Sequence, residues 1–154
     1  MIKYCDYSIV FQEIPDEVTL AVNISCCPNL CHGCHSPWLR EDHGEPLTHE
    51  SLHALINRYS GEITCICFMG GDGDPYNIES LSLYAKDSFP EIKTAWYSGR
   101  DTLAVNVKPA SFNYIKLGAY IEELGGLKSK NTNQRMYKIT SGGEMEDITN
   151  KFHK

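Results

Sequence analysis

Four of the seven cysteines in this 154-residue chain lie between positions 26 and 34. Three of them, Cys27, Cys31 and Cys34, have the spacing C-x-x-x-C-x-x-C. In a reducing compartment, thiolates this crowded usually bind metal, and an odd total of seven excludes complete disulfide pairing. A loop with this spacing can hold three irons of a cubic iron–sulfur cluster and leave the fourth iron open to a small molecule. The spacing therefore predicts a [4Fe-4S] cluster held by these three cysteines.

A structural zinc site is the alternative, completed by Cys26, His35 or His43. Zinc takes four closed ligands, commonly as two short pairs separated by a longer stretch. No second pair follows at a suitable spacing, because Cys65 and Cys67 lie inside an apolar run. The pattern favours the cluster, and Cys65 and Cys67 are expected to pack as small apolar side chains. Cys26 is left out of the cluster because it would lengthen the first gap to four residues.

Strands and helices are expected to alternate along the chain and to position the cysteine loop. Residues 17–25 and the continuous apolar run 63–69 predict buried strands, the first directly before the cysteine loop. Thr48 is a suitable N-cap for a helix that reaches Tyr59. Further elements are a helix over 78–88, strands over 92–97 and 114–117, and either a last strand or part of a closing hairpin over 134–140. A short edge strand is compatible with residues 8–14, and a short helix with residues 102–105.

The alternation of strands and helices predicts parallel pairing with right-handed crossovers. About four such units are too few for a closed eight-stranded barrel. We therefore expect a single α/β domain over residues 1–154, folded as an open partial (β/α) barrel with a mainly parallel sheet. The cysteine loop would then lie at the carboxyl ends of the strands, where α/β folds place their chemistry.

The composition and net charge of the chain argue against several classes of protein. Hydrophobic residues make up 42% of the chain, which suits a folded protein rather than a disordered one. No apolar run has transmembrane length and the N-terminus lacks a signal-peptide pattern, so we expect a cytoplasmic protein without membrane contact. The net charge of −6, without a block of Lys or Arg, argues against direct nucleic-acid binding.

Four segments of the chain resemble the radical S-adenosylmethionine (SAM) enzymes and, among them, the small activating proteins of anaerobic (class III) ribonucleotide reductase. They are Cys31-His32-Gly33-Cys34-His35 at the end of the cysteine loop, Phe68-Met69-Gly70-Gly71-Asp72, Trp96-Tyr97-Ser98-Gly99 and Thr132-Asn133-Gln134-Arg135. The resemblance covers most of the chain. It implies a partial barrel of the radical SAM type, a [4Fe-4S] cluster, and SAM bound at its open iron.

The resemblance also implies residues that contact SAM. Gly70 and Gly71 would hold the SAM amino group through their backbone, because glycine lets a ligand approach closely. The chain reads Gly-Gly-Asp-Gly-Asp-Pro where the family has Gly-Gly-Asp-Pro, so either Asp72 or Asp74 takes the acidic position, and Asp72 is favoured. Ser98 either lies near the SAM carboxylate or ribose, or caps its own turn.

Two further residues follow from the resemblance. His35 stands where the family often has an aromatic residue that packs near the adenine of SAM. Arg135 pairs with a carboxylate of SAM or with the partner protein, or else forms an ordinary surface ion pair.

The activity implied by the resemblance is reductive cleavage of SAM, with an electron from reduced flavodoxin or ferredoxin. The resulting radical takes a hydrogen atom from one glycine in the large subunit of anaerobic ribonucleotide reductase. No side chain is assigned as a general acid or base, because the cofactors carry the chemistry. Two alternatives stay open: a radical SAM enzyme acting on a small molecule, such as a minimal deazapurine-forming enzyme, and a non-catalytic zinc-binding interaction module.

Overall fold

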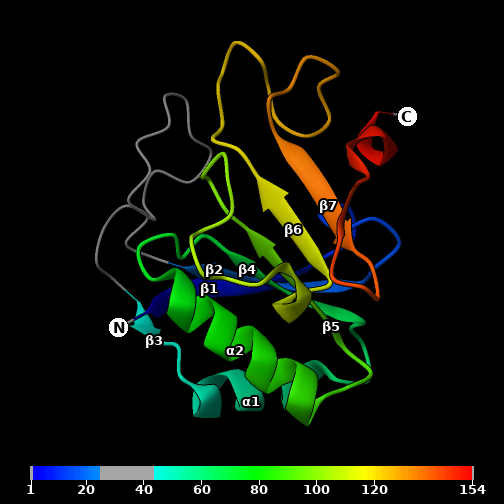
Figure 1. The fold of residues 1–154 in the computed structure, drawn as a ribbon. Coiled ribbons are helices and arrows are strands. Elements are labelled where there is room, and N and C mark those ends of the chain that lie inside the picture. Colours follow the sequence, from blue (N-terminus) through cyan, green and yellow to red (C-terminus); the bar gives the residue numbers. More distant parts are fainter. Residues whose placement is uncertain (1, 25–43, 154) are drawn as a thin grey trace.

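The computed structural model describes residues 2–24 and 44–153. Its framework is one eight-stranded sheet in the order β3-β1-β2-β4-β5-β6-β7-β8 (Figure 1). The strands are β1 Lys3–Val10, β2 Thr19–Ile24, β3 Glu45–Pro46, β4 Cys65–Met69, β5 Lys93–Tyr97, β6 Tyr114–Leu117, β7 Arg135–Ile139 and β8 Met145–Asp147. The helices are α1 His49–Tyr59 and α2 Pro75–Ser88, with short 3-10 turns η2 Pro109–Ser111 and η3 Thr149–Phe152.

The four central strands, β2, β4, β5 and β6, run parallel to one another. Asn23 pairs with Met69, Met69 with Tyr97, and Tyr97 with Lys116, so the four strands end level with one another. The turns after β4, β5 and β6 therefore meet at one edge of the sheet, as expected for parallel strands.

The prediction of an open partial barrel with a mainly parallel sheet is wrong. The described part of the chain has only two α-helices, and four of its seven strand pairings are antiparallel. β1 pairs with both β2 and β3, while β7 and β8 continue the sheet from β6 as antiparallel neighbours. Antiparallel neighbours can be joined by a short turn and need no helical crossover, so the strand–helix alternation does not extend to the sheet edges.

Local signals predicted the central elements well. α1 is confirmed with its N-cap: Thr48 Oγ1 accepts from Ser51 N at 3.1 Å, and Thr48 N donates to Ser51 Oγ at 2.8 Å. α2 begins at Pro75, three residues earlier than predicted, because Asp74 caps it and proline suits the first helical position. The short helix considered for residues 102–105 is not formed.

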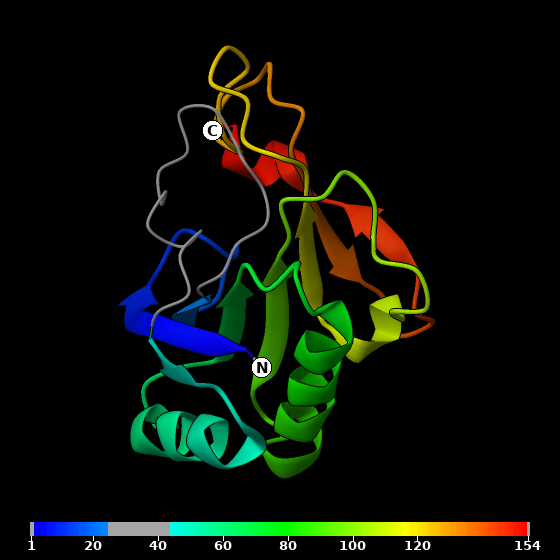
Figure 2. The ribbon, with the colours of Figure 1, turned by 90° about the vertical axis from the view of Figure 1, so that its left-hand side faces the viewer.

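Both α-helices cover the same face of the sheet (Figures 1 and 2). On this face the helices bury Leu52, Ile56, Ile78, Leu81 and Ala85 against Leu20, Val22, Ile66, Phe68, Trp96 and Ile115. The opposite face is covered by loop residues Ile14, Leu127 and Ile148, which pack on Cys65, Cys67, Ala95 and Met136. Cys65 and Cys67 are fully buried, which confirms their predicted role as small apolar side chains.

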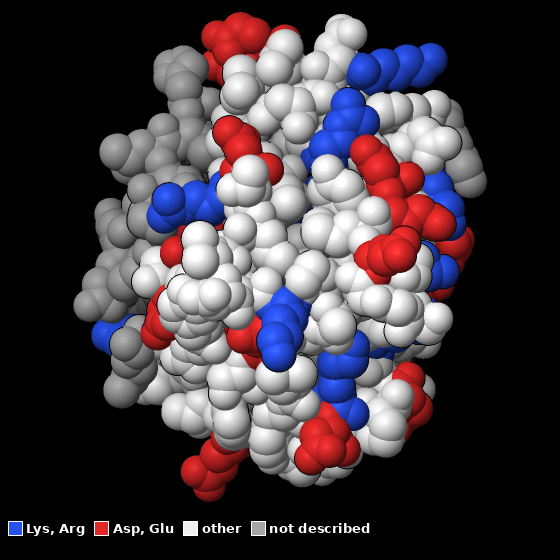
Figure 3. Space-filling view, in the orientation of Figure 1, with Lys and Arg blue, Asp and Glu red and all other residues white. Residues whose placement is uncertain are grey.

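The surface shows no separation of charge on the face drawn in Figure 3, where acidic and basic side chains are interspersed. This distribution matches the absence of a Lys or Arg block from the sequence. Within residues 2–24 and 44–153, no helix has the length and apolar character needed to cross a membrane.

Candidate functional site at the carboxyl ends of the parallel strands

The turns after β4 and β5 lie side by side at the edge where the parallel strands end. Gly70 and Gly71 follow β4, and Ser98 follows β5. Gly70 N donates to Tyr97 O at 2.9 Å, and Ser98 N donates to Lys116 O at 2.9 Å. The structure thus brings together four of the predicted site residues, Gly70, Gly71, Asp72 and Ser98.

Both glycines of the β4 turn have a backbone conformation that side chains disfavour, with φ of +104° at Gly70 and +88° at Gly71. A Cβ on Gly71 would lie 2.5 Å from Ile78 Cδ1 in α2, and one on Gly70 would lie 3.4 Å from the carbonyl oxygen of Ile24. The carbonyl of Gly70 accepts from Trp96 Nε1 at 2.7 Å. The glycines therefore allow the turn to approach both α2 and the end of β2.

Asp72 joins the turn after β4 to the turn after β5. Its side chain is buried, and its two carboxylate oxygens accept from Ser98 Oγ at 2.5 Å and from Gly99 N at 2.8 Å. Asp74 has a different role, because its carboxylate accepts from Asn77 N and caps α2. Of the two candidates for the acidic position, only Asp72 contacts Ser98.

The hydroxyl of Ser98 caps its own turn, since it accepts from Arg100 N at 3.1 Å while it donates to Asp72. Ser98 is only 1% exposed. The capping role considered for this serine is therefore present in the structure. Contact between Ser98 and SAM stays a prediction.

Lys116 is a further residue at this edge, and sequence reasoning gave it no role. The lysine is buried, and its Nζ donates to Ser98 O at 2.9 Å and to Gly118 O at 3.2 Å. Nζ also lies 5.3 Å from the centroid of the Tyr97 ring, within range of a cation–π contact. Lys116 thus holds the turns after β5 and β6 through their carbonyl groups. The signal in the sequence was a single cation inside the short apolar strand 114–117.

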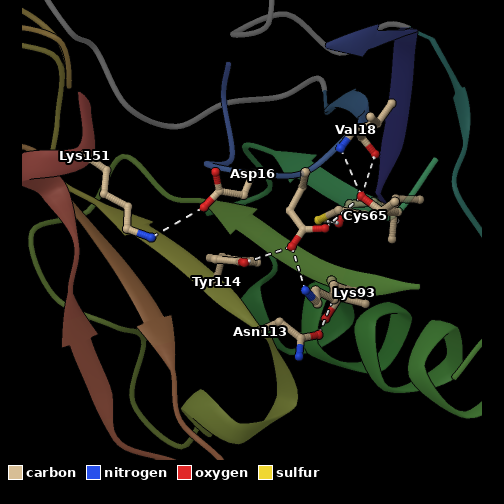
Figure 4. A network of polar contacts seen from close by, with 11 residues as sticks. Asp16, Val18, Cys65, Lys93, Asn113, Tyr114 and Lys151 are labelled. Atoms are coloured by element: carbon tan, nitrogen blue, oxygen red, sulfur yellow. Dashed lines mark hydrogen bonds and ion pairs between the residues drawn. The ribbon is translucent and has the colours of Figure 1, made fainter. Parts of the chain in front are cut away.

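A second polar network lies at the opposite, amino ends of the same strands. The carboxylate of Glu17 is buried and accepts from Thr64 Oγ1 at 2.7 Å, Lys93 Nζ at 2.7 Å and Tyr114 Oη at 3.0 Å (Figure 4). Burial, followed by the hydrogen bond to Glu17, raises the pKa of Tyr114. Burial, with a smaller contribution from Glu17, raises the pKa of Cys65 to about 12. The Cys65 thiol is therefore neutral at physiological pH, unlike a reactive or metal-binding thiolate.

The predicted cluster ligands Cys27, Cys31 and Cys34, together with His35, lie outside the described residues. Their roles stay predictions. β2 ends at Ile24, three residues before Cys27 in the sequence and at the same edge as Gly70. Within the described ranges, no group of three or more His, Cys, Asp or Glu side chains could hold a metal ion.

Arg135 lies apart from the glycine turn. It is the first residue of β7 and lines a pocket of about 330 Å³ whose walls include Asp101, Asn133 and Tyr137 but neither glycine of the turn. Its guanidinium Nη1 lies 3.8 Å from Asp147 Oδ2, and both side chains are 46% exposed. This is the weak surface ion pair that was one of the alternatives for Arg135.

Comparisons of the chain with protein-family models, with curated proteins and with solved structures found no match. A functional assignment therefore depends on the residues of this chain and on their arrangement.

Proposed function

We propose that this protein is a radical SAM activating enzyme that reductively cleaves SAM at a [4Fe-4S] cluster and generates the glycyl radical on anaerobic ribonucleotide reductase. The observation that supports this most is that the two strands that precede two of the sequence motifs lie side by side. The cysteine loop follows β2 and the Gly70-Gly71-Asp72 turn follows β4, and these strands are parallel neighbours. The sheet is mixed, so the predicted barrel does not support the proposal. The support comes from the central parallel strands alone.

The residues at this edge are compatible with SAM. Gly70 keeps the space beside the Ile24 carbonyl free of a side chain. Its own carbonyl has one lone pair engaged by Trp96, so the second can accept from an amino group. Asp72 and Lys116 hold the neighbouring turns, so the peptide groups that would meet SAM are fixed before it binds.

Each group has a defined role in this proposal. Cys27, Cys31 and Cys34 hold three irons, and Gly70 and Gly71 hold the amino group of SAM. When bound, the cluster and SAM supply the electron transfer and the radical that removes hydrogen from glycine. Reduced flavodoxin or ferredoxin provides the electron, and His35 packs near the adenine. The chain's own task is to bind, orient and shield, in the cytoplasm and without direct contact to nucleic acid.

A protein substrate suits this structure better than a small one. Both faces of the central strands are covered by the chain itself, by the helices on one side and by Ile14, Leu127 and Ile148 on the other. The substrate must therefore approach the edge where the strands end. A loop that carries a glycine can reach such an edge without being enclosed.

The test is to incubate the reconstituted, reduced protein with SAM and the large reductase subunit. We expect 5′-deoxyadenosine and a glycyl radical on the subunit, detected by electron paramagnetic resonance. Cys27→Ala should abolish both, whereas the adjacent Cys26→Ala should leave both intact, because only Cys27 has the required spacing. Cleavage stimulated by a metabolite and not by the subunit would favour the small-molecule enzyme.

A further inference from the structure

The outer face of α2 presents large apolar side chains to solvent. Tyr76 is 53% exposed and Leu83 is 49% exposed, and their separation of seven residues places both on one face of the helix. Val105, which is 76% exposed, lies beside them, because Tyr76 Oη donates to its carbonyl oxygen at 2.7 Å. Apolar side chains that gather on one face, rather than lie scattered, indicate a surface that another molecule covers.

These side chains border a groove of about 610 Å³ between α2 and the amino end of α1, which lie side by side (Figures 1 and 2). Contacts between the two helices hold the α1 wall of the groove. The His49 ring stacks on the Tyr84 ring with 4.6 Å between the centroids, and His49 Nε2 lies 3.0 Å from Ser80 Oγ. The groove is therefore formed before a partner arrives, which lowers the entropic cost of binding.

The carboxylates in the groove favour a basic partner. Glu79 and Asp87 line it, and no described Lys or Arg does. Asp87 takes part in none of the ion pairs among the described residues, and one oxygen of Glu79 accepts from Lys108 N at 2.8 Å. The neighbouring lysine of α2, Lys86, donates instead to Ala110 O at 3.3 Å. Charge complementarity therefore calls for a partner with basic side chains beside its apolar ones.

The regular spacing of the outer face favours a helix as the partner. Addition of a strand requires a sheet edge with unpaired backbone groups, whereas the peptide groups of α2 are bonded within the helix. A partner therefore contacts this face through side chains. Tyr76, Ser80, Leu83 and Asp87 recur at intervals of three and four residues. They form a ridge along about three turns, which suits packing against another helix.

The outer face of α2 also adjoins the candidate site. α2 begins at Pro75, directly after the turn that carries Gly70, Gly71 and Asp72. A helix seated along α2 therefore lies next to the edge where the parallel strands end. We infer that this face binds a helix of the large reductase subunit that carries Lys or Arg beside apolar residues. The inference rests on the proposed function for the identity of the partner.

Calorimetric titration of the reconstituted chain with the large subunit tests the apolar contact. Leu83→Ser should weaken binding about tenfold, because it truncates an apolar side chain at the centre of the interface. Phe11→Ser is the matched control. Phe11 is 70% exposed and lies outside the groove, so its loss should leave the affinity unchanged. Equal affinities of the two variants would overturn the inference.

Charge reversal tests the basic character of the partner. Asp87→Lys should weaken binding about tenfold at low ionic strength, and added salt should weaken binding of the unaltered chain. Glu91→Lys makes the same change outside the groove and should have a much smaller effect. Binding that strengthens with salt, or that is insensitive to Asp87→Lys, would contradict a basic partner and overturn the inference.

Two further measurements separate this inference from the proposed function. An unaltered chain that binds the subunit but forms no glycyl radical would overturn the proposed function alone. Radical formation by Leu83→Ser at an unchanged half-saturating concentration of subunit would overturn the inference alone. Self-association of the chain that Leu83→Ser abolishes in sedimentation velocity would also overturn it, because a second copy would then cover this face.

Discussion

The two ends of the central parallel strands each hold a buried carboxylate, but in different ways. At the amino ends, Glu17 accepts from three side chains, those of Thr64, Lys93 and Tyr114. At the carboxyl ends, Asp72 accepts from the Ser98 hydroxyl and from the Gly99 N–H, and Lys116 donates to the carbonyls of Ser98 and Gly118. The Glu17 network joins neighbouring strands to one another. The Asp72 and Lys116 contacts hold the turns that follow β4, β5 and β6.

The comparison shows that a buried polar network does not by itself identify a functional site. The Glu17 network has a buried acid, a lysine and a perturbed tyrosine, features often found in active sites. Its donors and acceptor nevertheless satisfy one another within the fold. The Asp72 network lies where the segments Phe68-Met69-Gly70-Gly71-Asp72 and Trp96-Tyr97-Ser98-Gly99 meet, and it positions peptide groups. Its place at the strand ends, more than its polarity, makes it the candidate site.

The largest effect on stability is expected from Glu17→Ala. The change leaves Thr64, Lys93 and Tyr114 without their shared acceptor, and we expect a loss of about 3 kcal/mol in the free energy of unfolding, toward the low end for a broken buried pair because Lys93 is 48% exposed. Urea unfolding measures the loss, and Glu17→Gln, which keeps an acceptor, should lose less. SAM cleavage by the folded variant should be unchanged. A large loss of SAM cleavage in a stable Glu17 variant would contradict the view that the Glu17 network stabilises the fold while the Asp72 network forms the candidate site.

An intermediate effect on stability is expected from Asp72→Asn. The change replaces the charged carboxylate that accepts from Ser98 and Gly99 with a neutral amide. We expect a loss of about 2 kcal/mol in stability and at least about a tenfold weaker affinity for SAM, because the turns after β4 and β5 separate. Asp74→Asn is the matched control. Asparagine is also a good N-cap, so this variant should change stability by less than about 0.5 kcal/mol. Calorimetric titration of SAM into both variants tests the expectation, and equal affinities would contradict it.

The smallest effect concerns pH at the amino ends. The pKa of the Cys65 thiol is raised from 9.0 to about 12 in the folded protein. Between these values the folded state binds more protons than the unfolded state, so stability falls as pH rises above about 9. For this single thiol the decline is at most about 1.4 kcal/mol per pH unit. Cys65→Ala should show a shallower decline in urea unfolding between pH 9 and 10.5. A decline of unchanged slope would mean that Cys65 does not titrate in this range.

Sequence patterns predicted the elements whose apolar residues are contiguous or recur at helical spacing. The run 63–69 contains β4, and the helical spacing after Thr48 corresponds to α1. The antiparallel edges were missed because strand direction depends on how segments connect, which local composition does not encode. In place of a strand over 8–14, β1 ends at Val10 and Ile14 is fully buried in the loop that follows.

The candidate site was predicted where it consists of local motifs. Gly70, Gly71 and Ser98 come from short segments, and the structure places them together at one edge. The partners of Glu17 were missed, because Lys93 and Tyr114 lie 76 and 97 residues away in the sequence. Contacts at such separations depend on the whole sheet.

The central claim is that the cysteine loop holds a [4Fe-4S] cluster with one iron open to SAM. Electron paramagnetic resonance of the anaerobically reconstituted, reduced protein, recorded with and without SAM, tests it most directly. We predict a [4Fe-4S]⁺ signal that changes when SAM is added and that is absent from Cys27→Ala. A protein that binds zinc and gives no such signal would contradict the claim and favour a zinc-binding interaction module.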